Sequence, residues 1–392
     1  MCNSISLQLL QPDELALRVA KVQHEMDAQQ LDAVLLCDNA NLFYLTGRVF
    51  CGFIYINVDG TIRYFLRRPS ILVGYNVCQI SRPDDIATHL PACKAIGLEV
   101  DTMPYSRIDR LKGFFAGASL GNASKVLRAA RAVKTPVEIQ LMEQSGALHA
   151  AAYDTIPSLY RRGMTDIEFQ IEIERALRLQ GCLGQFRVTG PDLEIFMGNI
   201  LTGENAENPS PYDFAMGGAG MHPSLPVGAN GTPIRPNTPV MVDANGNFTG
   251  YMTDMTRCFI DGEPTDIAVK ALRLSNEICA RVAEMAVPGA HTADLYNEAV
   301  AMAKDAGLGE YFMGYRYQAG FIGHGLGISI NEGPVLAPRS RDVLVANNAI
   351  AVEPKFVIPG TGAVGVENTY IVGETGAARR ITNANDDFGQ LS

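Results

Sequence analysis

The stretch that decides the fold is VMVDANGNFTGYMTDMTRCF, at residues 240–259. Two apolar runs, Pro239–Asp243 and Met255–Ile260, predict strands, and a segment rich in glycine and asparagine connects them. Asp243 ends the first run and Asp254 directly precedes the second. A carboxylate at an apolar strand position is costly to bury without a partner. Turn capping explains either residue singly, because aspartate side chains commonly bond to nearby backbone.

The register of this hairpin is open in the sequence. A two-residue turn at Asn245 and Gly246 would pair Asp243 with Phe248 and not with Asp254. A longer loop or a bulge is therefore needed to bring the two carboxylates together.

Three further segments carry polar groups in apolar surroundings: FIGHGLGISINEGP, AIAVEPKF and AVGVENTYIV. The first places His324 in a glycine-rich loop, where the backbone can pass close to an ion or ligand. The strand-like runs Ala349–Glu353 and Ala363–Val372 contain Glu353 and Glu367. Singly, each residue has an ordinary structural explanation, such as a loop histidine or an arginine-paired carboxylate. No Lys or Ser/Thr follows at the spacing of a phosphate-binding loop.

Taken together, these residues are four carboxylates and one imidazole in the same half of the chain. Buried carboxylates repel one another unless cations neutralise them. Two divalent ions about 3.5–4 Å apart would do so and could activate a bridging water.

The first part of the chain has the pattern of an α/β unit. We expect a helix from Pro12 to about Gln30, followed by a strand at Ala33–Cys37. The runs Gly52–Asn57 and Thr61–Leu66 flank a turn and predict a hairpin.

A basic, helix-forming connector precedes Pro136, for which Thr135 is a candidate N-cap. We place the domain boundary near residue 130, giving domains 1–130 and 131–392. Thr265 is a candidate cap for a later helix, and Thr292 begins another through about Ala306. Strands that flank helix pairs indicate an α+β second domain.

Composition limits the classes of partner. The 392 residues carry a formal net charge of -10, with a pI near 5.2. We therefore expect no nucleic-acid partner and no anionic membrane surface. No basic and apolar leader begins the sequence and no run is long enough to span a bilayer. The eight cysteines are scattered, so we expect free thiols and a cytoplasmic location.

The motifs resemble the pita-bread metallopeptidase superfamily (M24), in its creatinase, prolidase and aminopeptidase P branch. The shared features are D-x10-D with G-Y-x-x-D-x-T-R, then G-H-G-x-G, E-P and V-E-N, in the family's order. NLFYLTG (Asn41–Gly47) and RAVKTPVEI (Arg131–Ile139) extend the resemblance over nearly the whole chain. It implies a pita-bread catalytic domain after a creatinase-type N-terminal domain. The implied metal ligands are Asp243, Asp254, His324, Glu353 and Glu367.

The sequence departs from this family pattern at three positions. Val227 and Asn331 stand where the peptidases carry histidines, and Gly365 stands where an arginine braces the last ligand. Losing a donor that stabilises the intermediate typically costs about 10²–10³ in rate. His222 is a candidate substitute, or a plain loop histidine. Arg187, expected on a strand, could bind a substrate carboxylate or form a structural ion pair.

Three more residues are candidates for contact with the substrate. Asn331 can still hold a substrate carbonyl, because its amide donates hydrogen bonds. Tyr315 and Tyr317 could line the pocket or pack in the core.

The resemblance implies a dinuclear metallohydrolase of small amides or short peptides, of Xaa-Pro dipeptidase or aminopeptidase type, with Glu353 transferring protons. Mixed carboxylate and imidazole ligation favours Mn or Fe, with Co or Zn as alternatives. A homodimer is expected by resemblance alone. One alternative is a non-peptidase hydrolase or lyase that acts on a small metabolite with the same metal site. Another is a catalytically inactive binding module.

Overall fold

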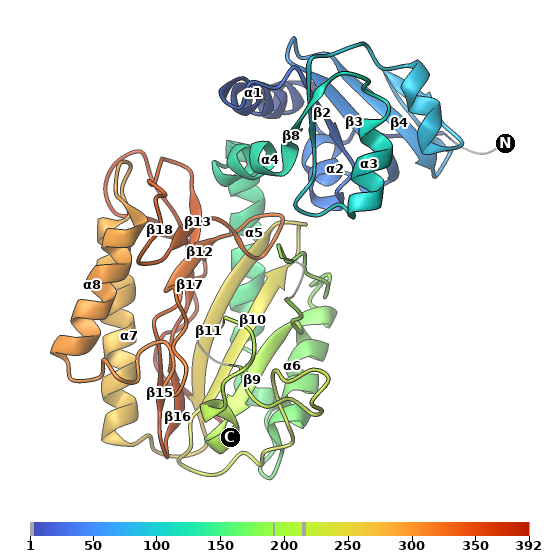
Figure 1. The fold of residues 1–392 in the computed structure, drawn as a ribbon. Coiled ribbons are helices and arrows are strands. Elements are labelled where there is room, and N and C mark those ends of the chain that lie inside the picture. The colour runs from blue at the N-terminus through green and yellow to red at the C-terminus, as the bar shows by residue number, and fades with distance from the viewer. Residues whose placement is uncertain (1–3, 191–192, 214–216, 392) are drawn as a thin grey trace. The chain divides into compact units, whose positions relative to one another are not determined.

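The computed structural model describes residues 4–190, 193–213 and 217–391. It divides into two compact units, Met1–Arg131 and Ala132–Ser392. Figure 1 shows mixed sheets and helices in both.

The N-terminal unit is built on a six-stranded mixed sheet in the order β6-β4-β3-β2-β7-β8. Its antiparallel centre is the predicted hairpin, in which β3 pairs with β4, and the predicted first helix and strand are also confirmed. The strands are β1 Ile5–Ser6, β2 Ala33–Leu36, β3 Cys51–Asn57, β4 Ile62–Arg68, β5 Leu72–Val73, β6 Val77–Gln79, β7 Ala95–Leu98 and β8 Ser119–Asn122. The helices are α1 Pro12–Ala28, α2 Asn39–Thr46, α3 Tyr105–Lys112 and α4 Ala123–Ala132, with a 3-10 helix at Pro83–Thr88.

The second unit contains a four-stranded sheet, β19-β11-β10-β9, a five-stranded sheet, β13-β12-β14-β17-β18, and the β15-β16 pair. The strands are β9 Gly198–Thr202, β10 Val240–Asn247, β11 Met252–Ile260, β12 Gly323–Gly325, β13 Glu332–Leu336, β14 Ala349–Val352, β15 Lys355–Ile358, β16 Gly362–Gly365, β17 Asn368–Ile371, β18 Arg379–Arg380 and β19 Gly389–Gln390. The helices are α5 Pro136–Tyr153, α6 Asp166–Leu179, α7 Asp266–Met285 and α8 Thr292–Asp305, with 3-10 helices at Ile156–Leu159 and Gly203–Glu207.

Three helices of this unit, α5, α7 and α8, begin where the sequence predicts. The Thr135 side chain accepts from the backbone N–H of Glu138, whose carboxylate accepts from Thr135 N–H in return. This capping box satisfies two backbone donors that a helix start leaves unpaired. Thr265 caps α7 by accepting from Ala268 N–H, and α8 begins at Thr292 as expected.

The two helix pairs cover different sheets, as Figure 1 shows for the second unit. Apolar side chains of α5 and α6 share a core with β9, β10 and β11. Those of α7 and α8 share the larger core with the strands of the five-stranded sheet and with β15 and β16. The strands that carry the predicted ligands therefore run between two buried apolar layers, which hold them in fixed positions.

Two details of the predicted strands are wrong. The run Ala363–Val372 is not one strand, because β16 ends at Gly365 and β17 begins at Asn368, with Glu367 at the break between them. Arg187 lies in an irregular segment and not on a strand. Its backbone oxygen nevertheless accepts a hydrogen bond from Ile330 N–H at 2.8 Å.

A candidate metal centre

The sequence left the register of the β10-β11 hairpin open, and in the structure the two strands pair without a bulge. β10 continues through Asn247, so that Asn245 pairs with Asp254 and Asp243 pairs with Thr256. Asp254 lies two residues before Thr256, the partner of Asp243, so the two carboxylates are diagonal neighbours on adjacent strands. Side chains in this relation point to the same face of the sheet. A longer turn brings them together, as the sequence required.

His324 lies at the centre of β12, which pairs with both β13 and β14. The strands approach so closely that a side chain on Gly323 would lie 2.2 Å from Ala351 O. One on Gly325 would lie 2.1 Å from Gly333 O. The glycines around this histidine therefore permit close strand packing.

The orientation of the His324 ring is set by its own backbone. Its Nδ1 lies 3.1 Å from Gly325 O, and a carbonyl oxygen can only accept, so Nδ1 carries the proton. The Nε2 lone pair then faces carboxylates, at 3.5 Å from Glu353 Oε1 and 3.9 Å from Asp254 Oδ2. This is the tautomer that a metal-binding histidine needs.

Glu353 and Glu367 lie where two pairs of strands break. Glu353 stands between β14 and β15 and Glu367 between β16 and β17. Thr256 Oγ1 donates to Glu367 Oε2 at 2.9 Å, and the backbones of these two residues form an isolated bridge. All five predicted ligands therefore converge on one buried cluster.

A sixth residue, Lys355, enters the same cluster. Its Nζ lies 2.8 Å from Asp243 Oδ2, 2.8 Å from Glu353 Oε2 and 3.0 Å from Glu367 Oε2. The ammonium has three protons and can donate one to each of these carboxylates. Only 2% of the Lys355 side chain is exposed, so this charge is held inside the protein.

The electrostatics of the cluster are those of crowded carboxylates. Burial raises the pKa of Glu367 to about 8, and the nearby Glu353 carboxylate adds to the rise. Burial also raises the pKa of Glu353, although Lys355 opposes it, and the pKa of Asp254 rises well above its ordinary value. For Lys355 burial would lower the pKa, but Asp243, Glu353 and Glu367 outweigh it and raise the pKa well above normal. The lysine is therefore charged. Its single positive charge does not balance the four carboxylates of the cluster.

The donor atoms fit a divalent ion. Ligand atoms of Asp254, His324 and Glu367 all lie within 4.8 Å of one another, so one ion with bonds of about 2.0–2.2 Å can join them after small side-chain shifts. Glu367 Oε1 is buried and has no hydrogen-bond partner within the part of the chain that is described. Burial lowers the pKa of His324 despite the carboxylates around it, which leaves its lone pair available. A cation among these atoms would satisfy all of them.

The sequence reasoning missed Lys355 and the residues that brace the last glutamate. Arg257 is buried, and its guanidinium donates to the backbone oxygens of Thr256 and Glu367 at 2.6 and 2.9 Å. It also donates to Asn368 Oδ1 at 2.8 Å. The signal for Lys355 was present in AVEPKF, where a lysine interrupts a buried apolar run and therefore needs an anionic partner.

The three other predicted site residues have defined surroundings. His222 is exposed, and its Nδ1 lies 2.9 Å from Ser224 Oγ in its own loop. Asn331 holds the backbone of Thr189 from both sides, donating to its oxygen at 2.8 Å and accepting from its N–H at 2.6 Å. Arg187, two residues before Thr189, is half-buried.

Three further positions that the sequence analysis named differ in burial. Val227 is fully buried, with an exposed fraction of 0%. Tyr315 and Tyr317 are exposed, by 43% and 76%, so they are not core residues.

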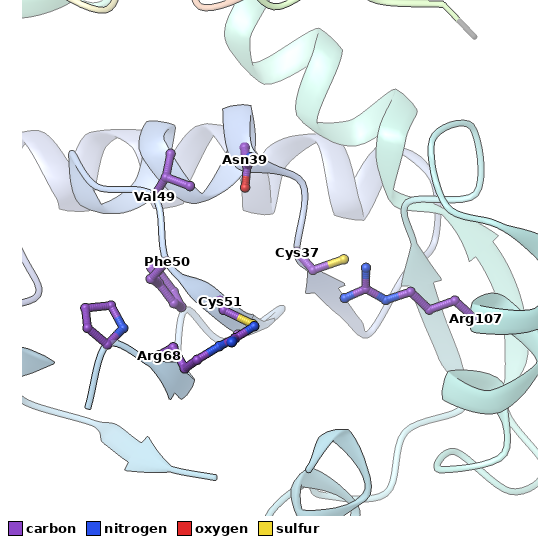
Figure 2. A pocket seen from close by; sticks show the side chains of 9 residues that line it. Cys37, Asn39, Val49, Phe50, Cys51, Arg68 and Arg107 are labelled. Atoms are coloured by element: carbon purple, nitrogen blue, oxygen red, sulfur yellow. The ribbon is translucent and has the colours of Figure 1, made fainter. Parts of the chain in front are cut away.

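A separate pocket of about 580 Å³ lies within the N-terminal unit. Figure 2 shows the guanidinium of Arg107 directed toward Cys37 on one side, with Arg68 beside Cys51 on the other. Burial, together with the Glu99 carboxylate, raises the pKa of the Cys37 thiol strongly. This thiol is therefore protonated and is a poor nucleophile.

With this fold and cluster in place, comparison with known proteins defines the class. Residues 140–374 match the model of metallopeptidase family M24, and residues 18–133 match the creatinase/prolidase N-terminal domain. The chain belongs to metallopeptidase family M24. Its resemblance to the creatinase, prolidase and aminopeptidase P branch and the predicted pita-bread fold are both confirmed, as is its assignment as a metallohydrolase.

Among individual relatives, the chain is similar to the Xaa-Pro dipeptidase of Pyrococcus horikoshii, with 24% identity over 88% of this chain and 91% of the relative. The Xaa-Pro dipeptidase of Lactobacillus helveticus is 27% identical over 67% of this chain and 64% of its own. Among solved structures, the Xaa-Pro dipeptidase from Bacillus anthracis has a TM-score of 0.79 at 24% identity, covering 95% and 99% of the two chains. Aminopeptidase P from E. coli with the inhibitor Pro-Leu has a TM-score of 0.73 at 16% identity, covering 96% and 97%.

Two other expectations can be compared with the structure. Within residues 4–190, 193–213 and 217–391, no helix is long and apolar enough to cross a membrane. The seven cysteines in those ranges are all free thiols, and Cys2 lies outside the described residues.

Proposed function

We propose that this protein hydrolyses the amide bond of a dipeptide-like substrate in a metal-dependent reaction, with Xaa-Pro dipeptides as the first class to test. The observation that supports this most directly is the buried donor set of Asp254, His324 and Glu367, with one glutamate oxygen left unpaired. Xaa-Pro dipeptidases recur among the relatives and the similar structures. The similarity to such a dipeptidase covers nearly the whole of this chain.

The residues of the cluster have different roles in the proposed hydrolysis. Asp254, His324, Glu353 and Glu367 would hold a divalent ion, which supplies Lewis-acid polarisation of the carbonyl and a more acidic water. Glu353 takes the proton of the attacking water and passes it to the leaving amine. Its Oε1 faces His324 Nε2, while its Oε2 accepts from Lys355. That hydrogen bond holds the carboxylate in one orientation, as proton transfer requires.

We include Arg187, Asn331 and His222 in the proposed substrate site. Asn331 fixes the backbone of the segment that carries Arg187, so its contribution would be to position that guanidinium. A guanidinium binds a free substrate carboxylate through paired hydrogen bonds. His222 is exposed and could donate to the tetrahedral intermediate.

The test is turnover of Gly-Pro and Ala-Pro by protein loaded separately with Mn, Fe, Co or Zn. We expect the highest rate with Mn, since carboxylate-rich ligation with a single imidazole suits that ion. Arg187→Ala should raise KM for substrates with a free carboxylate. Lys304→Ala, on the far end of helix α8, is the matched surface control. Absence of turnover across a dipeptide panel by metal-loaded protein would refute the peptidase activity.

A second candidate is a non-peptidase hydrolase or lyase of a small metabolite. Buried Val227 favours it, because an apolar side chain cannot stabilise an oxyanion by hydrogen bonding. Release of an amine, an acid or a sulfide from a metabolite panel, without dipeptide cleavage, would support this candidate over the first.

We also propose a homodimer in a reducing, cytoplasmic setting. The free thiols support the compartment. Light scattering of the purified protein tests the dimer, and a single monomeric mass would contradict it.

A further inference from the structure

We propose that the Lys355 ammonium permanently fills one of the two cation positions of this centre, so that each chain binds one divalent ion in place of two. This inference rests on the proposed metal-dependent function and concerns how many ions that function uses. It goes beyond the family pattern, since Lys355 is a property of this chain's own cluster.

The contacts of Lys355 are those expected of a bridging cation. It binds three carboxylates at 2.8, 2.8 and 3.0 Å, of which Asp243 lies within β10 and Glu353 and Glu367 lie at breaks between strands. All three ammonium protons are used by these contacts, and each carboxylate gives up one oxygen to it. No other side chain in the described part of the cluster brings positive charge to Asp243.

A metal ion cannot share these three oxygens with the ammonium at low cost. Bonded to them at about 2.0–2.2 Å, it would compete for the same lone pairs and stand close to a like charge. The cluster is buried, so solvent would screen that repulsion only weakly.

The fold has made room for the lysine and closes it in. Lys355 is the cross-strand partner of Gly365 in the β15-β16 pair. A side chain on Gly365 would lie 2.9 Å from Lys355 Cα and 3.2 Å from its Cγ. The missing side chain at 365 therefore leaves the space through which the lysine stem reaches the carboxylates.

The donor atoms of the cluster that Lys355 does not contact are enough to bind one ion. They are His324 Nε2, Glu353 Oε1, Asp254 Oδ2 and the unpaired Glu367 Oε1. Three of these four residues already form the compact donor group. Four N and O donors match a single divalent ion, and Asp243, which contacts the lysine through Oδ2, lies outside the compact donor group.

A different role for Lys355 would be to brace Glu367 in place of the arginine that the family pattern has at position 365. Bracing Glu367 requires only one of the three contacts, and Thr256 and Arg257 already hold that residue. The contacts with Asp243 and Glu353 are left unexplained by bracing and are explained by a cation position.

The experiment counts ions per folded chain. Wild-type protein is saturated with Mn, passed through a desalting column and measured by elemental analysis, with Mn EPR to separate isolated from coupled ions. We expect one ion per chain and an uncoupled EPR spectrum. Lys355→Met, which removes the charge but keeps the length of the stem, should bind two ions with a coupled spectrum. Lys134→Met is the matched control, because Lys134 is an equally buried lysine that pairs with Glu332, and its count should stay at one.

A second variant keeps the test valid if Lys355→Met does not fold. Asp243→Asn should still bind one ion, since Asp243 serves the lysine, whereas His324→Ala should bind none. Two ions or none in the wild type, or loss of the ion in Asp243→Asn, would overturn the proposal. Failure of dipeptide hydrolysis alongside a count of one would refute the proposed activity and leave the assignment of Lys355 intact.

Discussion

Lys355 and Gly365 face each other across the β15-β16 pair, and the residue without a side chain allows the longest side chain of the cluster to pass. In the sequence they lie in two separate segments, Lys355 in AVEPKF and Gly365 in AVGVEN, and only Gly365 is recognised there as a departure from the family pattern. In the structure the two positions are directly coupled, because they are cross-strand partners. A cation expected at position 365 is absent, and a cation from position 355 enters from the opposite strand.

This coupling predicts that Gly365→Ala is strongly destabilising. The new Cβ would lie 2.7 Å from Pro354 O, which is backbone and cannot move freely. Overpacking of this kind typically costs about 1–3 kcal/mol. Urea unfolding measures the loss. Gly320→Ala is the control, because a Cβ there meets only the flexible Asp213 carboxylate at 3.6 Å and should change stability little.

Glu353→Gln is predicted to abolish most of the activity while retaining the ion. An amide keeps one oxygen, which can contact an ion in the place of Oε1, but it loses the oxygen that accepts from Lys355 and cannot accept a proton. Loss of a general base typically costs about 10²–10⁴ in rate. Steady-state kinetics and elemental analysis on the same preparation measure both effects. Glu332→Gln, another buried glutamate outside the cluster, should retain the activity, and equal losses in the two variants would assign the effect to folding.

Withdrawal of the ion is predicted to lower the stability of the folded protein. Four carboxylates face a single ammonium in the metal-free cluster, so the folded state gains from a bound cation. An ion present at 100 times its Kd stabilises by about 2.7 kcal/mol. Thermal unfolding before and after treatment with EDTA measures this contribution. The same treatment of His324→Ala should produce no shift, and a shift of equal size there would place the ion elsewhere.

His149 predicts a pH dependence of stability. It lies buried beneath β10, where Nδ1 meets Thr253 Oγ1 at 3.1 Å, and burial lowers its pKa to about 3. Because the folded pKa lies below the unfolded value near 6.5, the contribution is complete above pH 6.5 and is lost as the pH falls. Between pH 7 and pH 5 the loss from this one group is about 2 kcal/mol.

Urea midpoints across that pH range, compared between wild type and His149→Gln, test the prediction. The variant should lose stability at every pH through poorer packing, but its dependence on pH should be flatter. His291→Gln is the control, since His291 is exposed and should leave the wild-type slope unchanged. A variant slope equal to the wild type would show that His149 is not the titrating group.

Much of the fold could be predicted because local rules and tertiary packing agree. The Thr135-Glu138 capping box and the Thr265 cap mark helix starts with side chains that act only on neighbouring residues. The β3-β4 hairpin likewise follows from alternation around a short turn. The five residues of the cluster were predicted by the order of their motifs, which resembles the family's, and by the expectation that several carboxylates in one core need a shared cation.

What could not be predicted depends on contacts between distant segments. β10 pairs with β9 as well as with β11, and both strands pack against helix α5, contacts that the turn residues by themselves do not reveal. The break at Glu367 arises from its bridge to Thr256, a residue 111 positions earlier. The role of Lys355 needed the positions of strand β10, of the break after β14 and of the break after β16 at once. Without them, AVEPKF is only a charged residue in an apolar run.

The Lys355 ammonium is covalently attached to the protein, and this has a consequence for a cell in which transition metals are scarce. An ammonium on a peptide chain cannot dissociate, be chelated or be exchanged for a different ion. A centre with one such cation would lose activity in proportion to the first power of the free metal concentration, where two independent ions would give a steeper loss. A cation held by the chain would thus replace part of the site's Lewis acidity with a gentler dependence on metal supply.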